Sequence, residues 1–322
     1  MQHPFQKLAD TILLNAYSVN SIGLYDGKCG MSLCLFELAH YLRDEQIEEY
    51  ACELLRESLA LSSKCENISL EYGLAGIGFA FLYLVENKFI DADIKDLFGN
   101  QLQKIQSQIK EIDNFSEKHL SLVHFLMLYN SLYKDSEMHN WVDKIIEDTE
   151  KILIQSFSDF NVIKSDIIKI KALDIFENYL KEIFLYDYPV SIPLLKLYSQ
   201  LFEKNKIGSR FGIGYYLDKL ARKLNNSELL VIAQANKKFA LQNIHPDTLN
   251  LAQRVNLLYL LNQEENITYA KQVSFLEENV FDFSNSECEK KISQSIQHNH
   301  CVVLLCWVCF LVLQILITEK KP

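Results

Sequence analysis

The chain has 322 residues, of which 49% are hydrophobic, and it contains only 10 glycines and 5 prolines. This composition excludes a disordered chain and the many turns of an all-β protein, and it favours long helices in one large domain or two ordinary ones. The formal charge is −10, and no stretch gathers Lys and Arg on one face, which excludes the basic surface that nucleic-acid binding needs.

The N-terminal stretch, MQHPFQKLADTILLNAYSV, mixes acidic and amide side chains with apolar ones. It lacks the basic region followed by an apolar core that marks a secretion signal. Cytoplasmic residence is therefore our expectation. The 8 cysteines lie mostly within apolar helical runs without the spacing of a disulfide framework, so we expect buried, reduced thiols.

Three segments share a glycine frame that leads into an apolar run. They read DGKCGMSLCLFELA at 26–39, YGLAGIGFAFLYLV at 72–85 and RFGIGYYLDKLA at 210–221. The second glycine of the frame falls at Gly30, Gly76 and Gly212, so the offsets are 46 and 136 residues, the latter about three times 45. A repeat of about 45 residues is therefore predicted.

This period places glycine-poor copies near residues 121, 167, 257 and 302. Apolar segments in phase are LSLVHFLMLYNSLY from Leu120, DIIKIKALDIFENYL from Asp166, VNLLYLLNQ from Val255 and CVVLLCWVCFLVLQILI from Cys301. Residues 134–190 break the strong periodicity, and they hold either a diverged pair of units or a small insertion.

The segments between these copies have a different pattern. The helix expected from Asp44 places Ile47, Tyr50, Ala51, Leu54, Leu55 and Leu59 on one face, and the helix expected from Asp91 places Ile94, Leu97, Phe98, Ile105, Ile109 and Ile112 on one face. Each unit therefore pairs a helix that is apolar nearly all round with an amphipathic helix that covers it. Two layers of helices are predicted.

The glycines gather at the start of the apolar helices. They are Gly27, Gly30, Gly73, Gly76, Gly78, Gly212 and Gly214. An open HEAT-like solenoid also has repeats of about 45 residues, but its helix-breaking residues usually lie in the turn between the two helices of a pair. Glycine lets backbone approach backbone where helices converge. We therefore predict an all-α fold of the α/α toroid type, with inner and outer helices.

The frames GLYDGKCGMSLCLFELA and NISLEYGLAGIGFAFLYL resemble the lanthionine synthetase C-like family, and GSRFGIGYYLDKL looks like a later copy. The resemblance covers residues 21–115 well and 205–225 less closely. It implies a toroid of up to seven helix pairs over residues 1–297, followed by an apolar C-terminal helix at 298–322. It also implies a role in ribosomal peptide maturation, in which family members add Cys thiols to dehydroamino acids and close thioether rings.

The family holds one zinc ion through a Cys in a W-C-x-G segment and an adjacent Cys and His in a C-H-G segment. The equivalent positions here are Tyr25, Asp26, Glu71, Tyr72, Ile207 and Gly208, and none is Cys or His. We therefore expect a relative without the family zinc site. His298, His300, Cys301, Cys306 and Cys309 form a second cluster of potential ligands, which we interpret as packed side chains because Cys301 and Cys306 diverge on a helix. We expect His40, His119, His124 and His139 to be packed or solvent-facing.

The starts of the inner helices of a toroid gather at one end, where their N–H groups form an electropositive rim. Side chains expected there are Tyr25, Asp26, Lys28, Glu71, Tyr72 and Arg210. They either cap and solvate helices or contact a peptide. Expected partners are a precursor peptide and a dehydratase. A non-catalytic binding protein and a carbohydrate-active toroid, with Asp26 and Glu71 as paired carboxylates, are the alternative functions.

The segment 301–317 has 17 residues with one polar side chain, and TEKKP follows it. Three interpretations remain open. It is a seventh inner helix, a membrane anchor with a basic flank, or an unrelated tail left by truncation or frameshift.

Overall fold

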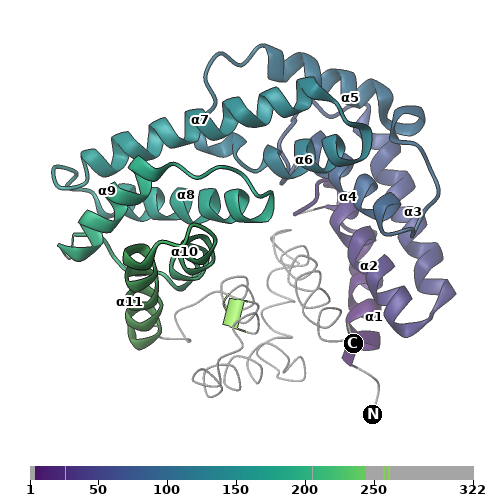
Figure 1. Ribbon diagram of the computed structural model, residues 1–322. Coiled ribbons are helices and arrows are strands. Elements are labelled where there is room, and N and C mark those ends of the chain that lie inside the picture. Colours follow the sequence, from purple (N-terminus) through teal and green to yellow (C-terminus); the bar gives the residue numbers. More distant parts are fainter. Residues whose placement is uncertain (1–3, 26, 205, 244–256, 258–259, 262–322) are drawn as a thin grey trace. The chain divides into compact units, whose positions relative to one another are not determined.

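The computed structural model describes residues 4–25, 27–204, 206–243, 257, 260 and 261. These residues are helical and include no strand, which confirms the all-α prediction (Figure 1). The chain divides into two compact units: unit 1 is Met1–Glu111 with Pro246–Pro322, and unit 2 is Ile112–His245. The boundary that the sequence predicts at residue 297 lies outside the described residues.

In unit 1, two strongly buried helices alternate with amphipathic ones. The helices are α1 (Pro4–Ala16), α2 (Lys28–Leu42), α3 (Glu45–Ser62), α4 (Leu74–Glu86) and α5 (Ile94–Lys110). The buried helices α2 and α4 pack against each other, and α3 and α5 pack against each other while covering α2 and α4. Unit 1 therefore has the two layers that the sequence predicts.

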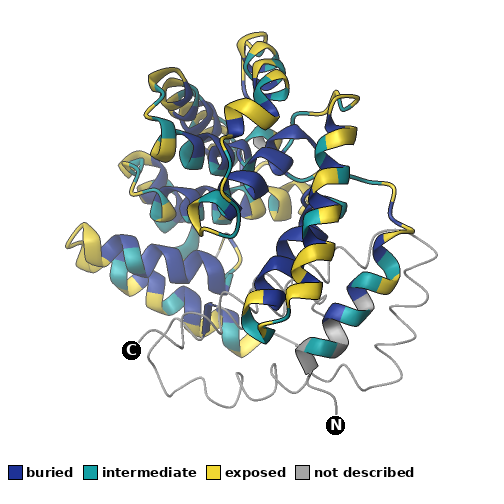
Figure 2. Cartoon of the chain, turned by 90° about the vertical axis from the view of Figure 1, so that its right-hand side faces the viewer, coloured by how far each residue is buried: buried dark blue, intermediate teal, exposed yellow. Residues whose placement is uncertain are grey.

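Burial separates the two kinds of helix. Every residue of α2 from Cys29 to Ala39 is buried, whereas α3 buries only one face, made of Ile47, Ala51, Leu54, Leu55, Ser58 and Ser62. Figure 2 shows the same contrast, with exposed residues gathered at helix ends and on one side of the covering helices. Two residues placed on the apolar faces by the sequence are instead exposed: Tyr50 by 43% and Leu97 by 55%.

Unit 2 begins with a short 3₁₀ helix, η1 (Glu117–His119), and continues with six α-helices. They are α6 (Leu122–Tyr133), α7 (Ser136–Ser158), α8 (Asp166–Leu185), α9 (Ile192–Glu203), α10 (Phe211–Lys223) and α11 (Ser227–Asn243). Here α8 packs against α10, while α7 packs against α6, α8 and α9, and α11 packs against α9 and α10. Residues 134–190, which break the strong periodicity, thus hold α7 and α8.

The spacing of the alternate helices follows the predicted period. Helices α2, α4, α6, α8 and α10 begin at residues 28, 74, 122, 166 and 211, so successive starts are 46, 48, 44 and 45 residues apart. The glycine-poor copies expected near 121 and 167 are therefore confirmed as helices. From the copy at Val255 the structure describes only Leu257, Leu260 and Leu261, all buried, and the copy at Cys301 lies outside the described residues.

Three of the covering helices start differently from the alternate helices, whereas α9 has no side-chain cap hydrogen bond. In α3, α5 and α7 an aspartate caps the helix, and its carboxylate accepts backbone N–H groups of the first turn: Asp44 from Gln46 at 3.0 Å, Asp93 from Lys95 at 2.7 Å and Asp135 from Glu137 at 3.0 Å. The alternate helices α2, α4, α6, α8 and α10 have no side-chain cap hydrogen bond. Preceding segments of backbone take over that role at the two glycine-rich starts of unit 1.

Candidate functional site

Two loops of unit 1 fold back on the starts of the buried helices. We name residues 21–25 with Gly27 loop A, before α2, and residues 67–73 loop B, before α4. In loop A the first helical N–H, of Lys28, donates to the carbonyl of Ser21 at 3.0 Å, and in loop B the N–H of Leu74 donates to the carbonyl of Asn67 at 2.8 Å. Both donors and both acceptors are 46 residues apart, so the loops are structural copies.

A second pair of hydrogen bonds repeats at the same offset. The N–H of Gly23 donates to Oγ of Ser21 at 3.4 Å, and the N–H of Ser69 donates to Oδ1 of Asn67 at 2.8 Å. Each loop therefore turns on a short polar side chain at its first residue. The repeat that the sequence predicts in unit 1 is thus present at the level of single hydrogen bonds.

The glycines of the frame are required by this fold-back. A Cβ atom on Gly30 would stand well under 3.0 Å from the carbonyl oxygen of Leu24, and a Cβ on Gly76 equally close to that of Leu70. Cβ atoms on Gly27 and Gly73 would likewise meet the backbone of their own loops. None of these glycines has a positive φ angle, so the constraint is space and not backbone conformation.

Loops A and B lie side by side. The N–H of Tyr25 donates to the carbonyl of Glu71 at 2.8 Å, and a Cβ on Gly76 would stand 2.8 Å from Cβ of Leu24. The two glycine frames of unit 1 therefore converge, as the prediction requires. Gly212 lies in unit 2.

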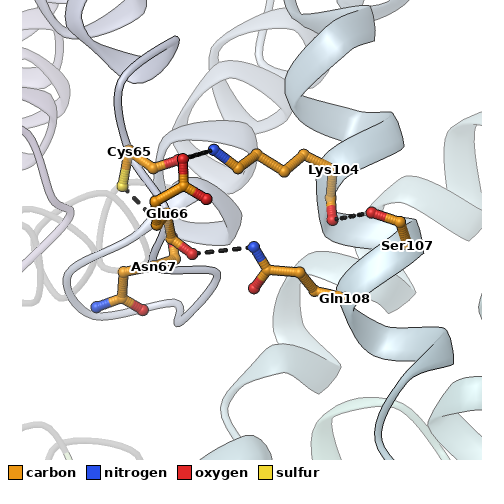
Figure 3. A network of polar contacts seen from close by, with 6 residues as sticks. All are labelled: Cys65, Glu66, Asn67, Lys104, Ser107 and Gln108. Atoms are coloured by element: carbon orange, nitrogen blue, oxygen red, sulfur yellow. Dashed lines mark hydrogen bonds and ion pairs between the residues drawn. The ribbon is translucent and has the colours of Figure 1, made fainter.

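The covering helices hold both loops in place. Lys28, at the start of α2, pairs with Glu57 of α3. Lys104 of α5 donates to the carbonyl of Cys65 at 2.7 Å and pairs with Glu66, while Nε2 of Gln108 donates to the carbonyl of Glu66 at 3.1 Å (Figure 3). These contacts attach residues 65 and 66 to α5, and they therefore fix the position at which loop B begins.

The predicted site residues of unit 1 differ in accessibility. Tyr72 is 53% exposed, and Tyr25 and Glu71 are half-buried. The side chain of Lys28 is only 12% exposed and is paired with Glu57, so its charge is already matched. Asp26 lies outside the described residues, so the predicted carboxylate pair of Asp26 and Glu71 stays a prediction. Tyr72 is the predicted side chain that is most open to a ligand.

Arg210 serves a different purpose in unit 2. It is the N-cap residue of α10, and its guanidinium pairs with Asp174 and lies 3.7 Å from Glu177, both on α8. Its N–H donates to Oδ1 of Asn236 at 2.9 Å. Arg210 therefore joins α10 to α8 and α11.

The glycines of the third frame also have a different neighbour. The carboxylate of Glu177 occupies the space that a Cβ on Gly212 would need, and a Cβ on Gly214 would stand 2.8 Å from the backbone nitrogen of Lys237 on α11. Burial raises the pKa of Glu177 above its usual value, and the charge of Arg210 offsets part of that effect. The third frame thus starts a helix without a folded-back loop.

A chain of three polar side chains joins α6 to α8, and sequence reasoning missed it. Nε2 of His124 lies 2.8 Å from Oε1 of Glu182, and Nδ1 of His124 lies 2.8 Å from the hydroxyl of Tyr186. The Glu182 side chain is 4% exposed, and its Oε2 atom has no hydrogen-bond partner among the described residues. The partners of His124 are 58 and 62 residues away, so spacing within one helix carried no signal. We interpret the chain as a polar network that orients α8 against α6.

The described cysteines form no disulfide with one another, and only two of them have the burial that the sequence predicts. Cys29 and Cys34 are buried, and Cys52 and Cys65 are half-buried. Burial raises the pKa of Cys29 to about 12, so its thiol stays protonated at neutral pH and is a poor metal ligand or nucleophile. Within the described ranges no three His, Cys, Asp or Glu side chains are grouped to hold a metal ion. The cluster from His298 to Cys309 lies outside them.

Segment 301–317, for which a membrane anchor is one interpretation, also lies outside the described residues. Among the helices of the described part, none has both the length and the apolar character needed to cross a bilayer.

Comparisons with known proteins returned no match: no family model, no curated protein and no solved structure resembles this chain significantly.

Proposed function

We propose that this chain is a lanthionine synthetase C-like protein of ribosomal peptide maturation, built as an α/α toroid, and that it binds a peptide at loops A and B. It is related to cyclases that add Cys thiols to dehydroamino acids, but it lacks the zinc ligands of their motifs. The resemblance of residues 21–115 to that family motivates the proposal. The regular spacing of alternate helix starts supports it.

One observation carries the choice of loops A and B. Two copies of the same fold-back are joined by the Tyr25 N–H bond to the Glu71 carbonyl, which sets two helix starts next to each other. The aromatic ring of Tyr72 stands exposed beside that junction. Tyrosine buries a large area at a small entropic cost, which is why it is frequent at binding hot spots. A peptide that lies across the junction would cover this ring.

The experiment is a binding titration with a fluorescent, Cys- and Ser-rich precursor peptide encoded beside the gene. We expect Tyr72→Ala to raise Kd about tenfold, the effect of one aromatic hot spot. Tyr17→Ala is the matched control, because Tyr17 is 67% exposed in the same unit but lies outside both loops. Equal affinity of both variants, or failure of the native chain to retain the peptide in mild salt, would contradict peptide binding at this site.

Zinc content separates the binding function from the cyclase function. Mass spectrometry of the purified chain is expected to find less than about 0.1 zinc per chain, since structural and catalytic zinc sites need three or four grouped ligands. A full equivalent of zinc, together with thioether formation on a dehydrated peptide, would establish the cyclase instead. A pull-down with a dehydratase tests the alternative of a partner enzyme, and retention of the dehydratase without the peptide would favour it.

A further inference from the structure

The beginning of α8 is poorly buried, and its first buried residue is Ala172. Arg210, at the start of α10, reaches α8 at the carbonyl of Ile170, 3.3 Å away, and at Asp174. His124, near the start of α6, contacts α8 only later, at Glu182 and Tyr186. We name residues 162–171, which lead into and form the beginning of α8, the α8 tip.

The α8 tip exposes four large aliphatic side chains within nine residues. The exposed fractions are 74% for Val162, 79% for Ile167, 53% for Ile168 and 52% for Ile170. Single exposed aliphatic residues are ordinary on a protein surface, but a contiguous group marks a site of interaction.

Lysines surround these side chains. Lys164, Lys169 and Lys171 lie within the tip against one acidic residue, Asp166, so the tip is locally positive in a chain of net charge −10. The Lys169 ammonium lies 5.4 Å from the centre of the Phe160 ring, so one of these charges lies next to the residues that precede the α8 tip. Aliphatic side chains with flanking lysines are the combination that favours an anionic lipid surface.

We propose that the α8 tip binds the surface of an anionic bilayer, with its aliphatic side chains among the lipid headgroups and upper acyl chains. A protein partner is the weaker choice, because the exposed side chains include no Trp, Tyr or Arg, the residues that dominate protein hot spots. Aliphatic side chains that are exposed at the beginning of a helix can be buried in lipid, and this does not require a partner of complementary shape. This binding is peripheral and uses residues other than those of loops A and B.

The test is sedimentation of the full chain with vesicles of phosphatidylcholine containing about 30% phosphatidylserine. We expect the native chain to bind these vesicles more tightly than pure phosphatidylcholine, and to bind less in high salt. Ile167→Asp with Ile168→Asp should lower the partition coefficient at least about tenfold, because acidic side chains are strongly disfavoured in the bilayer. Both positions are in the first turn of α8, where acidic residues favour the helix dipole, so folding should be preserved.

Val231→Asp is the matched control, since Val231 is 66% exposed on α11. This variant should bind like the native chain. No vesicle binding by the native chain would overturn the proposal. Undiminished binding by the double variant would overturn it too, because another segment, such as 301–317, would then carry the binding. A concentration-dependent dimer that the double variant abolishes would show instead that the tip is a surface for a second copy.

Discussion

The glycine-rich helix starts of the two units share a sequence frame but not a structure. In unit 1, Gly30 and Gly76 make room for the carbonyl of a loop that folds back from six residues upstream. In unit 2, Gly212 makes room for the Glu177 side chain and Gly214 for α11. The frame therefore marks where a buried helix begins, while the neighbour that demands the glycine depends on the local packing. This difference predicts unequal responses to the same substitution.

The largest effect is expected in unit 1. Gly30→Ala or Gly76→Ala places a methyl group against backbone that cannot move without breaking the fold-back, so each should lower the free energy of unfolding by about 3 kcal/mol. Urea unfolding followed by circular dichroism measures this. Gly99→Ala is the control, because nothing lies within 4 Å of its Cβ position in α5, and it should stabilise by about 0.5–1 kcal/mol. A Gly30→Ala variant as stable as the native chain would refute the packing argument.

A smaller effect is expected in unit 2. Gly212→Ala meets the end of a side chain that can turn away, so the cost should be about 1–2 kcal/mol. In a Glu177→Ala background, Gly212→Ala should lower the free energy of unfolding much less, because the obstructing carboxylate is gone. The double-mutant cycle by urea unfolding gives the coupling directly. An equal cost of Gly212→Ala in both backgrounds would mean that Glu177 is not the obstacle.

The smallest effect concerns the buried carboxylate that joins the two copies of unit 1. Glu37 of α2 accepts a hydrogen bond from the hydroxyl of Tyr83 on α4, and these positions are again 46 residues apart. Burial raises the pKa of Glu37, and the Tyr83 bond and the nearby His40 charge offset only part of this. A carboxyl whose folded pKa exceeds the unfolded value costs stability above the folded pKa, and the cost disappears as the pH falls toward the unfolded pKa.

Glu37→Gln should therefore be more stable than the native chain at pH 7, with a difference that shrinks as the pH is lowered toward the usual Glu range. Urea unfolding at several pH values measures it. A difference that stays constant with pH, or a Gln variant that is less stable at pH 7, would show that the Tyr83 bond outweighs the cost of burial.

The period of apolar segments predicted the helices well. It placed the start of α8 at Asp166, where the structure has it, and the start of α6 within two residues. This worked because each of these helices buries an apolar face, and an apolar run of helical length marks that face. The edges of amphipathic faces were less predictable: Tyr50 and Leu97 fall there, and their exposure depends on how far the neighbouring helix extends.

The site was predictable only in part. The glycine frame marked the helix starts that loops A and B precede, and Tyr72 at one of them is 53% exposed. Sequence could not show that Lys28 pairs with Glu57, 29 residues away, or that Arg210 pairs with Asp174 of α8. It also could not find His124 with Glu182 and Tyr186. Each of these depends on packing between helices, which no local pattern specifies.

The ring is the central claim, and it requires the third frame to converge with the first two. The test is the distance between positions 72 and 208, measured by double electron–electron resonance between two spin labels. The labels are attached to unnatural keto amino acids, so that the native cysteines stay unlabelled. Tyr72 is exposed, and nothing lies within 4 Å of a Cβ at Gly208. Seven inner helices about 10 Å apart enclose a ring roughly 22 Å across, so a mean distance within roughly 30 Å is predicted once the label arms are included. A distribution centred beyond roughly 45 Å would contradict the toroid and the kinship inferred with it.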